Sequence, residues 1–212
     1  TIVTEFLIKH LNAKSIGYIK AEEIPPVAAV HESRVVQPLE LFYDKKSNLL
    51  IVHALSDVKG MEWEIAKTMI KLASMLKAKE IITLDGVGAA AGTGEELYAY
   101  STDVKKRAVL EKDFTPLKKG IIVGISGALL VNTQGKKPAV CFLAETQSGL
   151  PDSKAAAKLI AALDKYLGLG VDYKPLLKQA RLFENKLKDI LSQSRQAIAA
   201  TKEAKSKQSY FG

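Results

Sequence analysis

The stretch KPAVCFLAE, residues 137–145, decides the fold class because it carries an uninterrupted apolar run from Ala139 to Ala144 that ends at Glu145. A short apolar run without alternation is typical of a strand that is buried on both faces of a sheet. Cys141 lies inside this run, and we expect it to behave as a small buried apolar residue. Two other segments have the same form and predict buried strands as well: EIITLDG at 80–86, and KKGIIVGISG at 118–127 with its apolar run from Ile121 to Ile125.

Helices are predicted between these strands. Apolar residues recur at helical spacing over 61–78 on more than one face, so this helix should pack between other elements. The segment YAYSTD leads into a predicted helix over Val104 to Lys112. Earlier, SIGYIK at 15–20 predicts a strand, and LELFYDKKSNLLIVHAL at 39–55 predicts a hairpin with its turn at 45–48. Strands that alternate with helices indicate an α/β sandwich with a largely parallel or mixed sheet covered on both faces.

Two helices are predicted at the carboxyl end of the chain. Asp152 is a good cap for the first, and Gly168 and Gly170 provide its stop. The second has a 4-3-4-3 apolar spacing that is typical of a helical hairpin or coiled coil, with the seam Leu176, Ala180, Phe183, Leu187 and Ile190. We therefore divide the chain into an α/β sandwich at 1–171, a helix at 172–200 that packs on the core or on a neighbouring subunit, and a flexible basic tail at 201–212.

Composition excludes several classes of protein. A chain of 212 residues with 47% hydrophobic residues is long enough for one main core. One cysteine excludes an intrachain disulfide framework, and three scattered histidines are too few for the usual structural zinc site, so we expect a reducing, cytoplasmic setting. No apolar run approaches the length that spans a bilayer, which predicts a soluble protein.

The net charge of +8 belongs mainly to the end of the chain. From Asp172 to Gly212 there are nine Lys or Arg and four Asp or Glu, an excess of five positive charges. Basic stretches of this kind are more often solvated helix faces than nucleic-acid-binding surfaces, and no interleaved aromatics provide a stacking platform. A nucleic-acid-binding module is therefore a low-ranked alternative, which predicts a steep loss of affinity with salt.

The glycine-rich stretch Gly86 to Gly94 follows a predicted strand but does not complete a nucleotide-binding motif. The third glycine comes one residue too late for a dinucleotide fingerprint, and no Gly-Lys-Ser/Thr sequence follows. Glu95 and Glu96 come next, and their carboxylates would repel phosphate. Ser126 and Gly127 likewise miss the spacing of a nucleophile elbow and are predicted to form a turn at a strand end. We therefore predict a flexible loop at 86–94.

Other candidate residues are dispersed. The histidines His10, His31 and His53 fall in different predicted elements, which favours surface or capping roles and predicts no metal site. Four carboxylates lie near predicted strand ends or helix starts, where ligand crevices form in open α/β sheets: Asp85, Asp103, Glu145 and Asp152. They could converge as an acid/base pair, and most are equally well explained as helix caps. No catalytic triad or complete cofactor motif is present in the sequence, so no catalytic residue and no cofactor is predicted.

Three segments together resemble the proteasome assembly chaperone 2 family in its archaeal form. They are GISGALL, the loop GTGEELYAYSTD, and the run ETQSGLPDSKAAAKLIAALDKYLGLGVDYKPLLKQA. The resemblance is strongest at the motif Glu145, Thr146, Gly149, Pro151 and Asp152, and it extends over about residues 15 to 195.

This resemblance implies a phosphorylase-like, three-layer α/β sandwich with a C-terminal helical extension. It further implies a non-enzymatic chaperone without cofactors, which forms homo-oligomers and binds the α subunits or α ring of the proteasome. Proteins that dock on proteasome α rings end in a hydrophobic residue, a tyrosine and any residue. The chain carries Tyr210, Phe211 and Gly212 at this place, with phenylalanine at the penultimate position.

The terminal aromatic pair also has a physical explanation that does not depend on the resemblance. Exposed aromatics at the end of a basic tether stabilise no core, so a partner that buries them is expected. The alternative is that the tail packs on its own domain. A rival function remains open at this point, an enzyme of the nucleoside phosphorylase kind or an ATP-dependent carboxylate ligase, which rests on the fold and the 86–94 loop.

Overall fold

The computed structural model describes residues 1–20, 29–31, 34–55, 58–88, 96–134, 137–146 and 152–178. The chain divides into two compact units, Thr1–Asp172 and Tyr173–Gly212. In the second unit, residues 174–178 are helical and Leu176 is buried. The other seam residues and the proposed docking residues lie outside the described residues: Ala180, Phe183, Leu187, Ile190, Tyr210, Phe211 and Gly212.

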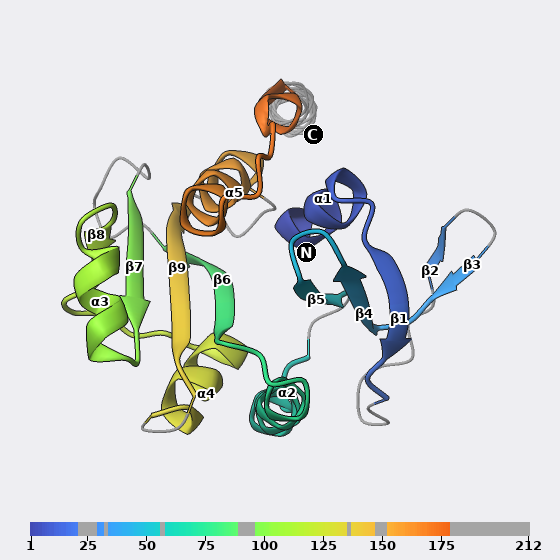
Figure 1. Ribbon diagram of the computed structural model, residues 1–212, viewed down its shortest axis with the longest axis horizontal. Helices are drawn as coiled ribbons and strands as arrows, with labels where there is room; N and C mark the ends of the chain where they lie inside the picture. The colour runs from blue at the N-terminus through green and yellow to red at the C-terminus, as the bar shows by residue number, and fades with distance from the viewer. Residues whose placement is uncertain are drawn as a thin grey trace, which may run out of the picture. The chain divides into compact units, whose positions relative to one another are not determined.

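The strands of the first unit form two larger sheets and one small hairpin (Figure 1). One sheet is antiparallel and has the order β1-β4-β5, with β1 at Lys14–Tyr18, β4 at Leu39–Asp44 and β5 at Leu49–Ala54. The other has the order β6-β9-β7-β8, with β6 at Ile81–Gly88, β9 at Ala139–Thr146, β7 at Leu97–Ser101 and β8 at Thr115–Pro116. The small hairpin pairs β2 at Ala29–His31 with β3 at Arg34–Val36.

Helices cover both faces of these sheets. Five helices are described in the first unit: α1 at Ile2–His10, α2 at Glu62–Met75, α3 at Val104–Leu110, α4 at Gly124–Asn132 and α5 at Ser153–Leu167. In Figure 1, α1 and α5 lie on one side of the strands, and α2 and α4 lie on the other. The contacts agree, because α1 packs on β5 and on α5, while α2 packs on α4. The first unit is therefore a three-layer α/β sandwich, as predicted.

The strand β9 forms the centre of the second sheet. Its residues Ala139, Cys141 and Leu143 pack with Leu130 of α4. The alternate residue Phe142 makes an edge-to-face contact with Tyr166 of α5, with ring centroids 5.6 Å apart. Residues from Ala139 to Ala144 are all fully buried, which confirms the prediction that this strand is covered on both faces. Burial of an aromatic side chain such as Phe142 contributes about 1.5–3 kcal/mol.

The second sheet is mixed. β6 and β9 are parallel neighbours, paired from Ile81 opposite Ala139 to Gly88 opposite Thr146. β7 runs antiparallel to β9 on its other side. A parallel pair requires a long crossover, and here the chain between β6 and β9 supplies β7, α3, β8 and α4. The mixed sheet predicted from the sequence is therefore confirmed.

The predicted hairpin at 39–55 is also confirmed. β4 and β5 pair directly, from Asp44 opposite Leu49 to Leu39 opposite Ala54. The carboxylate of Asp44 accepts hydrogen bonds from the backbone N–H groups of Lys46 (3.3 Å) and Ser47 (2.8 Å), and Asn48 adopts a positive φ of 51°. These are the side-chain chemistry and backbone geometry that a tight turn requires.

One predicted strand is wrong. The run from Ile121 to Ile125 forms no strand, because residues 121–123 are irregular and α4 begins at Gly124. Ser126 and Gly127 consequently lie inside a helix rather than in a strand-end turn. The helix α4 is apolar on nearly all sides, so its sequence has no helical period that would distinguish it from a buried strand.

Within the described part of the chain, no helix is long and apolar enough to cross a membrane.

Candidate functional site

The carboxyl ends of the parallel strands β6 and β9 bring together the residues that the sequence places at strand ends. Val87 lies opposite Glu145, and Asp85 lies opposite Leu143, so the two carboxylates come from adjacent strands two register positions apart. Ligands bind outside the carboxyl ends of strands in many open α/β sheets. This edge of the sheet is therefore a candidate functional site.

Glu145 uses both of its carboxylate oxygens to hold the start of β7. The side chain is buried, and it accepts hydrogen bonds from the hydroxyl of Tyr98 (3.2 Å) and the backbone N–H of Glu96 (3.4 Å). In return, the backbone N–H of Glu145 donates to the carbonyl of Glu96 at 2.9 Å. Burial raises the pKa of Tyr98, and the negative charge and hydrogen bond of Glu145 raise it further. Tyr98 is thus kept as a neutral donor, which fits an anchoring contact between two strands.

Asp85 is engaged locally, since its carboxylate accepts a hydrogen bond from the backbone N–H of Gly86 at 2.9 Å. The two carboxylates of this edge are therefore both paired with donors of the chain itself. These contacts do not support the acid/base pair that remained possible from the sequence.

Gly86, on β6, lies next to Thr146, a residue of the family motif on β9. A Cβ atom at position 86 would lie 3.0 Å from the Cγ2 atom of Thr146 on the neighbouring strand. The hydroxyl of Thr146 donates to the carbonyl of Val87 at 3.4 Å. Gly86 therefore lets the side chain of Thr146 pack closely on the neighbouring strand. Residues 86–88 of the predicted flexible loop instead form the end of β6. Residues 89–94 of that loop, and Gly149 and Pro151 of the motif, lie outside the described residues.

The remaining two candidate carboxylates are helix caps. Asp103 accepts from the backbone N–H of Lys106 at 2.8 Å at the start of α3. Asp152 accepts from the backbone N–H groups of Lys154 and Ala155, each at 2.9 Å, at the start of α5. These contacts satisfy donors that the first turn of a helix leaves free. The cap interpretation of both residues is confirmed.

The histidines lie in different elements. His53 on β5 is buried, with its Nδ1 atom 2.8 Å from the Thr4 hydroxyl, and burial lowers its pKa. This differs from the surface or capping role expected from the sequence. His10 on α1 stacks on Phe6 with ring centroids 5.7 Å apart, and His31 belongs to β2. Among the described residues, no group of three or more His, Cys, Asp or Glu side chains is placed to hold a metal ion.

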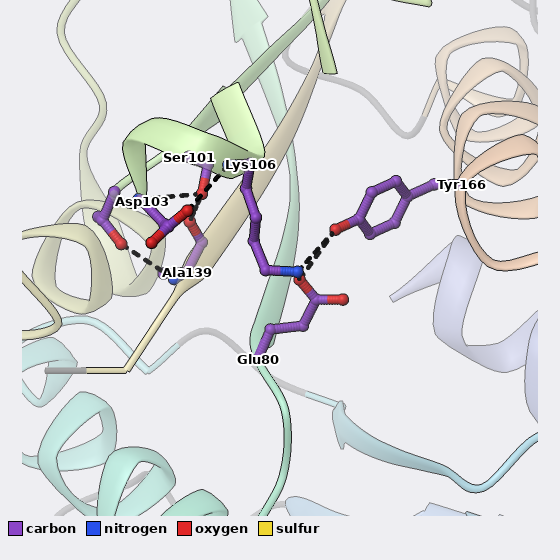
Figure 2. A network of polar contacts seen from close by, with 7 residues as sticks. Glu80, Ser101, Asp103, Lys106, Ala139 and Tyr166 are labelled. Atoms are coloured by element: carbon purple, nitrogen blue, oxygen red, sulfur yellow. Dashed lines mark hydrogen bonds and ion pairs between the residues drawn. The ribbon is translucent and has the colours of Figure 1, made fainter. Parts of the chain in front are cut away.

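The amino end of β6 carries a polar cluster that the sequence analysis missed, the Glu80 clasp, formed by Glu80, Lys106 and Tyr166 (Figure 2). Glu80 precedes β6, Lys106 belongs to α3 and Tyr166 belongs to α5. The Glu80 Oε2 atom lies 2.7 Å from the ammonium of Lys106 and accepts a hydrogen bond from the Tyr166 hydroxyl at 2.9 Å. The Lys106 ammonium also donates to the Tyr166 hydroxyl at 3.4 Å.

Charges in the Glu80 clasp stabilise one another. Burial works to lower the pKa of Lys106, but the hydrogen bond and charge of Glu80 outweigh it and raise that pKa. Burial raises the pKa of Tyr166, and the hydrogen bond to Glu80 raises it further. The raised pKa values keep Lys106 as an ammonium and Tyr166 as a neutral phenol, and with Glu80 these residues join three separate parts of the chain. No short motif marks residues so distant along the chain.

Comparisons with known proteins agree with the resemblance found in the sequence. Residues 1–191 match the model of the PAC2 family. The crystal structure of Pyrococcus furiosus PbaA, an archaeal homologue of proteasome-assembly chaperone, is 30% identical with a TM-score of 0.82, covering 95% of this chain and 86% of that chain. An uncharacterized protein of Methanocaldococcus jannaschii is 27% identical over 191 residues, which are 88% of this chain and 78% of the relative.

Pyrococcus furiosus PbaB, an archaeal proteasome activator, shares the fold at 23% identity. Its TM-score is 0.75, and the match covers 89% of this chain and 86% of that chain. The matches to these three proteins cover 88–95% of this chain and 78–86% of the protein compared.

Proposed function

The chain belongs to the PAC2 family, and from this membership we propose that it is a non-enzymatic chaperone that binds proteasome α subunits or the α ring. In this role it assists assembly or activation of the proteasome. The observation that carries the proposal is the similarity to PbaA, with 30% identity and a TM-score of 0.82 over 95% of the chain. Fold alone would not carry it, because one fold hosts many functions.

The proposed contact is the aromatic pair Tyr210 and Phe211 together with Gly212, presented by a homo-oligomer. Two adjacent aromatics after a charged segment, TKEAKSKQS, offer apolar surface that a pocket between partner subunits can bury. Several tails on one oligomer would raise the overall affinity without a new kind of contact, because each later binding event becomes intramolecular.

The rival enzymatic function has less support from the described residues. The carboxylates of Asp85 and Glu145 are paired with the chain's own donors. Gly86 accommodates Thr146 of the neighbouring strand. Neither contact favours a phosphate or nucleoside site, so a second function is not proposed.

The test is calorimetric titration of purified proteasome α subunits with the full chain and with a variant that lacks residues 210–212. The full chain should bind and the truncated variant should lose most of its affinity. Burial of one phenyl ring contributes about 1.5–3 kcal/mol, so Phe211→Ala should weaken each tail contact by about ten- to a hundredfold. Phe211→Tyr should bind equally or more tightly, and Ser209→Ala is the matched control that should change little.

Two results would contradict different parts of the proposal. If the full chain bound no α subunit, the chaperone function would be wrong. Full affinity in the truncated variant would retain the function but place the contact elsewhere on the molecule.

The proposed helix at 172–200 has a separate test. If its seam packs on the core or on a neighbouring subunit, Leu187→Ala should cost about 2–5 kcal/mol of stability or weaken the oligomer. Thermal unfolding and light scattering measure these effects. Lys188→Ala, one position off the seam, is the control, and equal behaviour of the two variants would contradict the seam.

A further inference from the structure

The segment between β8 and α4 exposes an unusual amount of apolar surface. Ile121 is 89% exposed and Val123 is 73% exposed, the two highest values among the described large apolar side chains. Between them, Ile122 packs against the buried cluster formed by Leu130, Ala139, Cys141 and Leu143. The side chains of residues 121–123 thus alternate between solvent and core, as in a strand with one exposed face.

Most backbone groups of this segment have no partner among the described residues, whereas the Val123 carbonyl accepts a hydrogen bond from the backbone N–H of Gly127 at 3.4 Å. Among the hydrogen bonds between described residues, none involves the backbone N–H or C=O groups of Lys118 to Ile121. Val123 has the extended angles φ −108° and ψ 177°. The chain bends at Lys119, so the exposed stretch that could pair with another chain follows this bend, from Gly120 onward.

The segment is held firmly at both ends. Leu117 donates its backbone N–H to the carbonyl of Ala99 on β7 at 3.0 Å. At the other end, α4 begins at Gly124, and Gly127 allows its first turn to pack closely against the carbonyl of Ile122. A binding edge held in this way needs little ordering when a partner arrives.

Positive charge surrounds the exposed apolar residues. Lys118 and Lys119 are both exposed at one end of the segment. At the other end is the amino terminus of α4, which has no side-chain cap hydrogen bond and no acidic residue in its first turn. The amino end of a helix carries a partial positive charge. A second copy of the chain would bring the same positive groups together, whereas an acidic segment would complement them.

We propose that residues 120–123 are a docking edge for an extended acidic segment of a partner protein. The partner's backbone pairs with the free backbone groups, its alternate apolar side chains pack on Ile121 and Val123, and its carboxylates lie near Lys118, Lys119 and the start of α4. This proposal does not rest on the proposed function, because the partner is defined by its chemistry alone.

A designed peptide tests the proposal on the full chain. The probe is a dye-labelled, end-blocked peptide in which glutamate and valine alternate, and its binding is measured by fluorescence anisotropy. It should bind, whereas the counterpart with lysine in place of glutamate should not. The double variant Ile121→Ser/Val123→Ser should weaken binding by about tenfold or more, since it removes two apolar contacts. Lys118→Glu/Lys119→Glu should cause a comparable loss, and Val131→Ser, which changes a 57% exposed residue of α4, should leave binding unchanged.

A second probe separates strand pairing from simple charge attraction. The same acidic peptide, N-methylated at alternate residues on its pairing edge, keeps its charge and side chains but cannot donate from that edge, so it should not bind. This comparison needs no protein variant and stands even if a substituted chain misfolds. The proposal fails if neither peptide binds, if the methylated peptide binds equally, or if Val131→Ser loses as much affinity. It also fails if Ile121→Ser/Val123→Ser lowers the oligomer size without changing peptide binding, because the segment would then be an interface between copies.

Discussion

Gly127 packs so closely against Ile122 that a Cβ atom on residue 127 would overlap the Ile122 carbonyl group. The obstacle is backbone, which cannot move aside as a flexible side chain would. We therefore expect Gly127→Ala to destabilise the protein by about 1–3 kcal/mol, although alanine is the better helix former. Urea denaturation measures this change.

The control for Gly127 is Gly88 at the end of β6. A Cβ atom there would meet nothing within 4 Å. Gly88→Ala should stay within about 0.5 kcal/mol of the parent chain. If neither substitution changed the free energy of unfolding, the backbone at the start of α4 would be able to shift and accommodate a Cβ atom at position 127.

The Glu80 clasp should contribute to stability through the Tyr166 hydroxyl. Tyr166→Phe keeps the ring against Phe142 and removes the hydroxyl that donates to Glu80 and accepts from Lys106. We expect a loss of about 0.5–1.5 kcal/mol in thermal or urea unfolding.

Coupling between Tyr166 and Glu80 gives a stricter test of the clasp. After Glu80→Gln has removed the carboxylate that both partners share, Tyr166→Phe should cost measurably less than in the parent chain. Additive effects in this double-mutant cycle would mean that the three groups act independently.

Asp152 should stabilise α5 as its amino-terminal cap. Asp152→Ala leaves the backbone N–H groups of Lys154 and Ala155 without their acceptor and should cost about 0.5–2 kcal/mol. Asp152→Asn retains a capping oxygen and should lose much less. Thermal unfolding compares the variants, and equal losses would show that the cap hydrogen bonds do not account for the effect.

Cys141 should make the stability of the protein depend on pH at alkaline values. Burial raises the pKa of its thiol from the ordinary 9.0 to about 11. Between these pH values the unfolded chain releases a proton that the folded chain keeps, so the free energy of unfolding falls as pH rises. The contribution reaches on the order of 2 kcal/mol by pH 11.

Cys141→Ala removes this ionisation and is compared with the parent chain by urea denaturation from pH 8 to pH 11. The difference in the free energy of unfolding between the two proteins should shrink or change sign over this pH range. Curves that stay parallel would show that the thiol does not resist ionisation in the fold.

Sequence patterns identify the elements whose side chains have a distinct period or composition. The apolar run of β9 is long enough, and bounded clearly enough by Pro138 and Glu145, to predict burial on both faces. The helix α5 has a cap at Asp152 and a stop at Gly168, where φ is 67°, and both are visible in the sequence. Local chemistry decides these elements, so a single sequence suffices.

Elements whose form depends on tertiary packing are not predictable in this way. The run at Ile121 to Ile125 resembles a strand, and only the contact of α4 with α2 and the sheet decides that residues from Gly124 onward are helical. The sequence predicts no element for Ile2–His10, which forms α1. The pairing of Glu145 with Tyr98 depends on which strands become neighbours, and strand order is not encoded in any local pattern.

The strand β8 has a consequence for how the protein behaves at high concentration. Within the described residues it is the outermost strand of its sheet, it consists of Thr115 and Pro116 only, and Pro116 lies opposite Ala99 of β7. Proline has no backbone N–H, so this short edge cannot donate to an incoming strand at that residue. The sheet therefore lacks a donor at this point of its border, which disfavours the addition of another strand opposite Pro116.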